Sequence, residues 1–449
     1  MSGLVELSYS YILFASAGGG GSGGGGSSGG VGYGLILIGY LPMFILGDYF
    51  RKREKVDTGN FITWPVAIIY SILLIAIFKG YGFIMAIGAV LGTGSGLYGW
   101  LSKLRRNKNA ENKLQVASST DASWKKNTLE PFTKQVFERF QYDWSRNDIE
   151  PMKNYLTPRY LQHIQLMILA LTQASRVNQM SNVEVTYQNI QTVNDASDNS
   201  QDSFVMGFEA LATDELIDTR TNSSIYTRKA SFIEFWQFVK SGQTWLLDGI
   251  TPATANLGSE NSTIKQFAER SSLYYSLDWG WLLLPQRGQI FNKGKFGVSD
   301  INNHVIGMYN NHLIQIYTFC PNPANKPNDQ YLIAQMILPK SYGDIVVRHK
   351  LGFFANLLRV NVKGLKKIET EWPDFNKKYE VYASMGEGAT SFELLHPAFM
   401  EVLEAQGFEI NLEVVDNMVY FYSLPKKLQP ENYPKFLTIL QEAFKQMRL

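Results

Sequence analysis

The sequence predicts a membrane-anchored α+β protein, with three transmembrane helices followed by two folded domains. The first observation is a set of three apolar segments, at 31–47, 62–78 and 81–101, none of which contains an ionisable residue. Crossing the hydrocarbon core takes roughly 20 residues, with a lower limit of about 17. The second observation is a pair of helical patterns followed by strand patterns between 129 and 250. The third is a further mixture of strand and helix patterns after residue 262.

Two clusters of basic residues flank the apolar segments and predict the orientation of the chain. One cluster follows the first segment and the other follows the third: Arg51, Lys52, Arg53 and Lys55, then Lys103, Arg105, Arg106 and Lys108. Three spans place both clusters on one side, and basic residues favour the cytoplasmic side. The sequence therefore predicts a protein of the bacterial inner (plasma) membrane, with its N-terminus outside and its soluble domains cytoplasmic.

Residues 1–30 predict a signal-like start and a disordered tract. Leu7–Phe14 is a short apolar run, and Ala15-Ser16-Ala17 resembles a cleavage site. No lysine or arginine precedes the run, so cleavage stays open. The glycine-serine tract Gly18–Gly30 lacks the lysine of a phosphate loop and is typical of a flexible linker. After the third apolar segment, residues 103–127 are polar and predict a tether.

The third apolar segment carries three glycines at a spacing of four, Gly88, Gly92 and Gly96. On a helix this spacing places small residues on one face, where another helix backbone can approach closely. Packing against the second segment is the simpler interpretation. A homo-oligomer that forms through the third segment is the alternative.

The first soluble domain is expected at residues 128–252. An amphipathic helix is expected at about 129–145, where Phe132, Val136, Phe140 and Trp144 recur every four residues. A second helix, at about 149–175, is expected to break near Pro158. Strands are then expected at 183–193, 203–213, 230–239 and 244–250. Helices followed by antiparallel strands predict a sheet that curls around a helix.

Several residues of this domain occur in an order that is characteristic of a known family. They are Phe137, Gln141–Trp144, Asp148, Leu156-Thr157, Phe208–Asp214, Phe235–Phe238 and Trp245–Ile250. Over about 129–252 the chain resembles the TIM forty-four-like family, the C-terminal domain of the mitochondrial presequence-translocase anchor subunit and its bacterial membrane-anchored relatives. The resemblance implies a cone-shaped α+β fold with an apolar groove, and binding to a membrane, a polypeptide or a ribosome rather than catalysis. The candidate groove or core aromatics are Phe137, Phe140, Trp144, Phe208, Trp236 and Trp245.

A second α+β domain is expected at residues 262–449. Strand patterns lie at 304–307, 313–319, 331–338, 344–348, 379–382 and 419–422, and helical patterns lie at 392–405 and 432–447. Residues 290–425 resemble an uncharacterised bacterial domain family, chiefly through an aromatic-rich strand and a proline-initiated helix within 375–421.

Catalytic chemistry finds little support in the sequence. Polar clusters occur at Asp278–Gly280 and Asp300–His304, and Asp344 lies near His349. On one strand the odd separation of Asp344 and His349 places their side chains on opposite faces, so turn capping and ion pairing are favoured. The lone Cys320 excludes an internal disulfide and is expected to be a buried thiol. We therefore predict no catalytic, cofactor or metal residues.

The sequence as a whole predicts an inner-membrane anchored, non-catalytic binding or scaffold protein. Its TIM forty-four-like domain is expected to bind a protein, peptide or lipid partner, in membrane-protein biogenesis or translocation. The net charge of +2 gives no support to nucleic-acid binding. The alternative is a membrane-associated enzyme that uses the polar clusters of the C-terminal half. The partner, the oligomeric state and the role of the C-terminal domain do not follow from the sequence.

Overall fold

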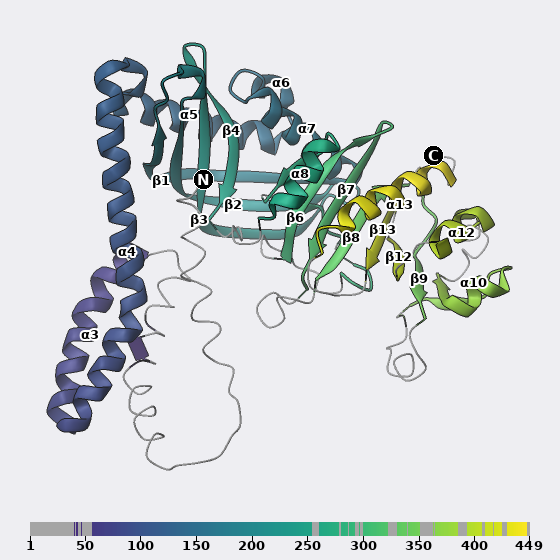
Figure 1. The fold of residues 1–449 in the computed structure, drawn as a ribbon, viewed down its shortest axis with the longest axis horizontal. Coiled ribbons are helices and arrows are strands. Elements are labelled where there is room, and N and C mark those ends of the chain that lie inside the picture. The colour runs from purple at the N-terminus through teal and green to yellow at the C-terminus, as the bar shows by residue number, and fades with distance from the viewer. Residues whose placement is uncertain are drawn as a thin grey trace. The chain divides into compact units, whose positions relative to one another are not determined.

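The computed structural model describes residues 40, 42, 43, 46 and 56–446, with gaps at 254–259, 278–279, 286, 292–295, 297–299, 322–329, 339, 351–361, 363, 385–392, 406–408, 416 and 424–428. The helices are α3 (Val56–Phe78), α4 (Gly80–Thr120), η1 (Ala122–Trp124), α5 (Lys126–Ser145), α6 (Ile149–Met152), α7 (Pro158–Gln173), α8 (Ser262–Arg270), η4 (Gly280–Leu283), α10 (Pro373–Lys378), α12 (Pro397–Ala405) and α13 (Asn432–Gln446), with a single turn η2 at Asn199–Gln201. The strands are β1 (Arg176–Asn194), β2 (Ser203–Asp218), β3 (Ser223–Ser241), β4 (Thr244–Pro252), β5 (Tyr274–Ser276), β6 (Ile301–Tyr309), β7 (His312–Phe319), β8 (Tyr331–Ile337), β9 (Ile345–His349), β10 (Lys366–Ile368), β11 (Tyr379–Ala383), β12 (Ile410–Val415) and β13 (Met418–Ser423) (Figure 1).

The chain forms two compact units. The first consists of residues 1–139, 182–213 and 229–249, and the second of residues 140–181, 214–228 and 250–449. The strands β1, β2 and β3 each contribute residues to both units, because each is between 16 and 19 residues long and continues past a unit boundary.

The helices α3 and α4 form a hairpin that turns at Lys79, whose φ is 48°. The backbones approach closely near the turn, because a Cβ on Gly82 would lie 2.1 Å from the carbonyl oxygen of Leu74. Further along, Ala67 of α3 and Ala89 of α4 are buried together with Met43. Small residues therefore allow the two helices to pack.

The prediction of three transmembrane helices is wrong. Within the described part of the chain, no helix combines the length and the apolar character needed to cross a bilayer. The apolar stretches belong to helices that also contain polar sequence: α3 begins with Asp57, Thr58 and Asn60, and α4 continues without a break to Thr120. Residues 103–120, which the sequence predicts as part of a tether, are thus helical. The predicted first span, at 31–47, lies outside the described residues except at residues 40, 42, 43 and 46.

The end of α4 is fixed by a buried lysine. The side chain of Lys240, on β3, is only 4% exposed and forms an ion pair with Asp121, directly after α4. The Nζ atom of Lys240 also donates to the hydroxyl of Ser123 at 2.6 Å and lies 3.9 Å from the carboxylate of Asp202. The hydrogen bond from Lys240 holds the pKa of Asp121 at about 2. A buried ammonium needs such partners, so we interpret this cluster as a structural one.

The four predicted strands after α7 are confirmed, and each is longer than its sequence pattern. They form a four-stranded sheet in the order β1-β2-β3-β4. The predicted break at Pro158 is also confirmed: α6 ends at Met152, and α7 begins at Pro158 with Thr157 as its N-cap, accepting from the amide of Tyr160. The proline has no N–H to leave unpaired at this first helical position.

The C-terminal domain is built on a nine-stranded antiparallel sheet in the order β10-β11-β9-β12-β13-β8-β7-β6-β5. The six predicted strands and two predicted helices are present; β5, β10 and β12 and the helices α8 and α10 were not predicted. One face of the sheet carries Ile316, Ala334, Val414 and Phe421 against the helices α8, α12 and α13 (Figure 1). The opposite face carries Tyr317, Phe319, Ile333 and Tyr422, which pack against Leu284 and Phe291. Both faces of the central strands are therefore buried.

Candidate functional site

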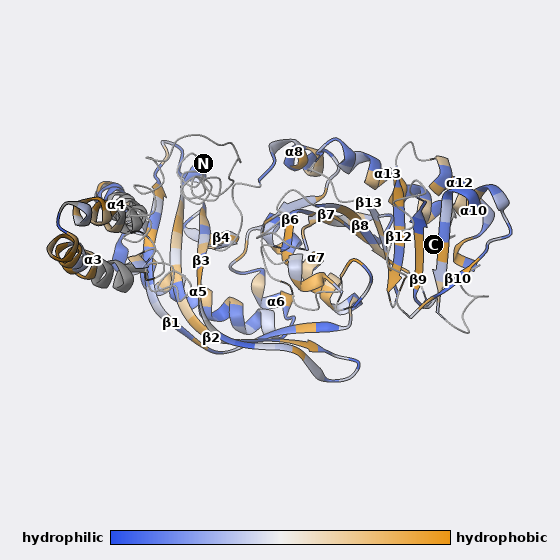
Figure 2. Ribbon diagram, turned by 90° about the horizontal axis from the view of Figure 1, so that it is seen from below, coloured by the Kyte–Doolittle hydropathy of each residue, from blue (hydrophilic) through white to orange (hydrophobic). Residues whose placement is uncertain are grey.

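The helical hairpin presents an exposed apolar surface, which we call the hairpin surface. It consists of Val66, Ile68, Ile69, Ile72, Leu73, Ile75, Ile77 and Phe78 on α3, and Tyr81, Phe83, Ile87 and Val90 on α4. Among the described residues these are twelve of the seventeen exposed large hydrophobic side chains, so the exposure is concentrated here. Figure 2 shows α3 coloured as mainly hydrophobic. Apolar surface gathered in this way marks a binding surface for a membrane or a partner.

The predicted glycine face lies on the second helix of this hairpin. Gly88, Gly92 and Gly96 all fall within α4. Packing or self-association through these glycines stays a prediction.

The six aromatic residues proposed as groove or core are all buried. Phe137 on α5 lies 4.7 Å from the ring of Phe208 on β2 and 4.8 Å from that of Trp236 on β3. Trp245 on β4 packs against Trp124 and Phe204, with ring centroids 4.7 and 4.9 Å away. In the second unit, Phe140 and Trp144 stack on each other at 6.2 Å. All six have relative exposures of 5% or less, so the structure places them in hydrophobic core.

The second face of the nine-stranded sheet contains a row of buried polar side chains, which we call the polar row. Its members are paired directly across neighbouring strands: Gln315 with Gln335, Gln335 with Tyr420, and Tyr420 with Glu413. Directly paired residues of antiparallel strands point to the same face. The hydroxyl of Tyr317 donates to Oε1 of Gln335 at 2.5 Å, and Nε2 of His304 lies 3.0 Å from Oε1 of Gln315.

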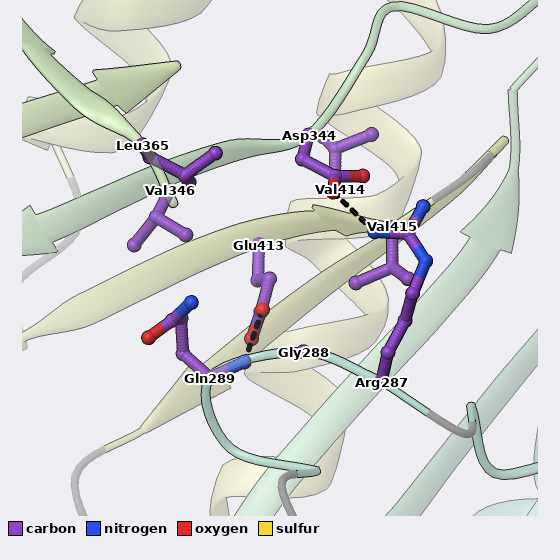
Figure 3. Close-up of a pocket in the computed structure, with 9 residues that line it drawn as sticks. All are labelled: Arg287, Gly288, Gln289, Asp344, Val346, Leu365, Glu413, Val414 and Val415. Carbon is purple, nitrogen blue, oxygen red and sulfur yellow. Dashed lines mark hydrogen bonds and ion pairs between the residues drawn. The ribbon is translucent and has the colours of Figure 1, made fainter. Parts of the chain in front are cut away.

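Glu413 ends this row and lines a cavity of about 180 Å³ (Figure 3). Glu413 as a whole residue is 2% exposed, and its carboxylate accepts the backbone N–H of Gln289 at 2.5 Å and, more weakly, that of Ile290 at 3.4 Å. Gly288 has a φ of 136°, and a Cβ there would lie 2.9 Å from Oε1 of Glu413. A glycine therefore allows the chain to cross closely above the carboxylate.

Charged and aliphatic groups complete the cavity. Arg287 forms an ion pair with Asp344, and Val346, Leu365 and Val415 supply hydrocarbon walls (Figure 3). Burial raises the pKa of Glu413 to about 7; the two backbone N–H groups and Arg287 oppose the increase, while Asp344 adds to it. A carboxyl group that titrates near neutral pH in a cavity is a candidate functional group.

Asp344 and His349, the polar pair considered from the sequence, interact with different partners. Asp344 is bound by Arg287, whereas the backbone N–H of His349 donates to Asn411 and the His349 ring lies against Tyr379. Cys320 is buried, as predicted. Asp278 lies outside the described residues. Among the described residues, no group of three or more His, Cys, Asp or Glu side chains is arranged to hold a metal ion.

Glu413 was missed by the sequence reasoning. The segment Ile410–Val415 alternates apolar residues with Asn411 and Glu413, a pattern typical of a strand with one solvated face. A signal was nevertheless present in Arg287-Gly288-Gln289, where a glycine is followed by a polar residue after the apolar run Leu282–Pro285. Only the fold brings that glycine onto the glutamate, 125 residues further along the chain.

Comparisons with known proteins leave the family open. No protein-family model matches the chain, and no curated protein matches it. The crystal structure of the mycobacterial trehalose monomycolate transport factor A, TtfA, matches with 12% identity and a TM-score of 0.31, over 41% of this chain and 92% of that one. The intermembrane-space region of the chloroplast protein ARC6 matches with 14% identity and a TM-score of 0.23, over 28% of this chain and 95% of that one. Scores this low establish no shared fold, and the TIM forty-four-like resemblance stays a prediction.

Proposed function

We propose that this chain is a membrane-bound, non-catalytic binding or scaffold protein. The hairpin surface holds it on a lipid bilayer, and its folded units bind a protein or peptide partner. The observation that carries the proposal is the concentration of exposed aliphatic side chains on α3 and the start of α4, such as Ile69 at 59% and Ile72 at 61% exposure. Leaving so much hydrocarbon in water is unfavourable by about 25 cal/mol per Å².

The basic residues in the sequence before and within the hairpin favour lipid over a protein groove as the occupant of this surface. Four basic residues precede α3 in the sequence, at 51–55, and four more occur on α4 at 103–108. The two helices are antiparallel, so the start of α3 and the middle of α4 are at the same end of the hairpin. Basic residues close in sequence to an apolar segment match anionic headgroups, each contributing about 1 kcal/mol near the membrane.

The same charges motivate the proposed location. The cytoplasmic leaflet carries the anionic lipids, so the proposal places the folded units on the cytoplasmic side of a bacterial inner membrane. The resemblance to the TIM forty-four-like family motivates a role in membrane-protein biogenesis or translocation. The partner is then a polypeptide that the membrane-bound chain holds close to the bilayer.

Flotation of the full-length chain with lipid vesicles tests this proposal. We expect the chain to float with zwitterionic vesicles through the hairpin surface, and to float more completely with vesicles that contain anionic lipid. Raising the salt concentration removes only the second part of the binding, because salt screens charges and leaves the hydrophobic contribution in place. Failure to float with either type of vesicle contradicts membrane binding. Crosslinking in intact membranes, followed by identification of the captured polypeptide, tests the scaffold role separately.

A further inference from the structure

When Glu413 is ionised, its carboxylate adds to the cavity a negative charge that forms no ion pair with a described cation. Within the described part of the chain, no lysine or arginine nitrogen lies within 4 Å of the Glu413 carboxylate. The guanidinium that also lines the cavity, Arg287, is bound to Asp344. Two carboxylates and one guanidinium leave one net negative charge when Glu413 is ionised. Two backbone N–H groups only partly replace the hydration that a buried carboxylate loses.

The walls of the cavity restrict the chemical class of a ligand that could supply the missing charge. A volume of about 180 Å³ is well above the roughly 10–15 Å³ that one water needs, so the cavity has room for a small organic group. Most of the accessible lining is polar and includes the acceptor oxygens of Glu413, while Val346, Leu365 and Val415 offer a smaller aliphatic part. Hard cations require several oxygen ligands, and among the described residues no group of three or more His, Cys, Asp or Glu side chains is arranged to hold a metal ion. A cation with an alkyl chain satisfies both kinds of wall.

We propose that the Glu413 cavity binds a small organic cation, an alkylammonium or alkylguanidinium group. The nitrogen donates hydrogen bonds to the Glu413 carboxylate, and the alkyl chain lies against Val346 and Leu365. The same chemistry occurs in a free amine and in the lysine or arginine side chain of a partner polypeptide. This inference concerns the second unit and does not depend on membrane binding.

The proposal predicts that binding and protonation compete. A cation beside Glu413 favours the ionised carboxylate, so binding releases a proton below pH 7 and is tighter above it. The other groups facing Glu413 are Arg287 and Asp344 beside the cavity and Tyr420 on β13. Arg287 is always protonated, and Asp344 is already paired with it. Glu413 therefore accounts for the pH dependence between pH 6 and 8.

Calorimetric titration of the full-length chain tests the proposal with four probes that share one alkyl chain. We expect butylammonium and butylguanidinium to bind, and butanol and butyrate not to bind. Binding of the cations should be about tenfold tighter at pH 8 than at pH 6, because the ionised fraction of a group with a pKa near 7 changes by that factor. Glu413→Gln should weaken binding at least tenfold. Glu404→Gln, which removes a carboxylate on α12 that pairs with Lys378, is the matched control and should leave binding unchanged.

Two further results decide the outcome. Circular dichroism of Glu413→Gln must match that of the parent chain; if this variant does not fold, Val346→Trp, which fills the cavity, replaces it. Nα-acetyl-lysinamide distinguishes the source of the cation: binding as tight as that of butylammonium indicates a polypeptide side chain, and binding of the free amine alone indicates a small molecule. Equal binding of butylammonium and butanol, or binding that Glu413→Gln leaves intact, overturns the proposal.

Discussion

Folded proteins usually bury apolar side chains and expose polar ones, and the hairpin and the nine-stranded sheet depart from this rule in opposite ways. The hairpin exposes apolar side chains, whereas the sheet buries polar ones. On α3, isoleucines such as Ile72 and Ile77 are more than 60% exposed. On the second face of the sheet, Gln315, Gln335 and Glu413 are at most 3% exposed. Folded proteins tolerate single exceptions of either kind, but a concentration of them is informative.

The two departures have different physical costs and therefore point to different partners. Exposed hydrocarbon has an unfavourable free energy that any apolar environment removes, so its partner is defined by area and needs little specific geometry. A buried carboxylate has an unfavourable free energy that only a positioned donor or cation removes, so its partner is defined by geometry. This difference supports the proposal of a lipid surface as the partner of the hairpin, and of a particular small group as the partner of the Glu413 cavity.

The largest expected effect is on the hairpin. Ile69→Asp combined with Ile72→Asp should weaken vesicle binding by about 4 kcal/mol, roughly a thousandfold, because burial of each isoleucine contributes about 1.5–3 kcal/mol. The measurement is the partition coefficient from flotation at several lipid concentrations. Tyr187→Asp combined with Leu211→Asp, exposed residues on β1 and β2, is the control and should bind as the parent chain does. An equal loss in both double variants would show that the hairpin surface is not the lipid-binding region.

The second effect concerns the carboxylate in the sheet. The pKa of Glu413 is about 7, above its ordinary value of 4.5, so the folded state holds the proton more tightly than the unfolded state. The contribution of this group to stability is complete below pH 4.5 and is lost as the pH rises to 7. Between pH 5 and 8 the parent chain should lose about 2–3 kcal/mol that Glu413→Gln does not lose. Urea unfolding at both pH values measures the difference, and parallel pH profiles in the two proteins would rule out a raised pKa.

The sequence predicts all four strands of the first sheet and six of the nine strands of the second, because these strands contain regular apolar patterns. Alternation along 203–213 and 230–239 locates β2 and β3, and the apolar run 313–319 locates β7. The transmembrane prediction fails for a different reason. Composition identifies an apolar stretch, but it does not show that the helix containing it continues into polar sequence, as α4 does beyond residue 103.

The candidate site is much less predictable than the strands. β12 was not predicted, and the alternation of Asn411 and Glu413 with apolar residues would have indicated one solvated face, although all six of its residues are buried. Their burial results from the hairpin of β12 with β13, from the pairing of β12 with β9 and from the crossing of the chain at Gly288. The last two contacts connect residues more than 60 positions apart. Neighbouring residues in the sequence carry no record of such a contact. The six aromatic residues illustrate the converse, because local periodicity predicts burial but does not separate a core from a groove.

A third effect sharpens the description of the cavity. Gly288→Ala introduces a Cβ that meets the Glu413 carboxylate at 2.9 Å in a backbone conformation with a φ of 136°. Gly364 has a φ of 78°, but no atom lies within 4 Å of the Cβ that Gly364→Ala introduces. The stability lost in Gly364→Ala therefore measures the strain of the backbone conformation alone. We expect both variants to lose about 1–3 kcal/mol, with Gly288→Ala about 1 kcal/mol worse. In a Glu413→Ala background this excess should vanish, which thermal unfolding of the four variants measures. An excess that persists without Glu413 would mean that the loop does not depend on the carboxylate.

The smallest effect separates two glutamines that lie side by side in the polar row. Within the described structure, Nε2 of Gln335 has no hydrogen-bond partner, whereas its Oε1 accepts from Tyr317. Gln335→Leu removes an unsatisfied donor and a useful acceptor together, so we expect the stability to change by less than about 1 kcal/mol. Gln315→Leu removes only the partner of His304 and should cost about 1–2 kcal/mol.

Chemical denaturation of both leucine variants measures the difference. Equal losses would show that burial alone, rather than hydrogen-bond satisfaction, sets the energetics of the row. If the predicted order holds, the side chains of the polar row contribute unequally to stability. The sheet then tolerates leucine at Gln335, which lies two strands from Glu413. The functional requirement for polarity would then be confined to the Glu413 end, where the row meets the cavity.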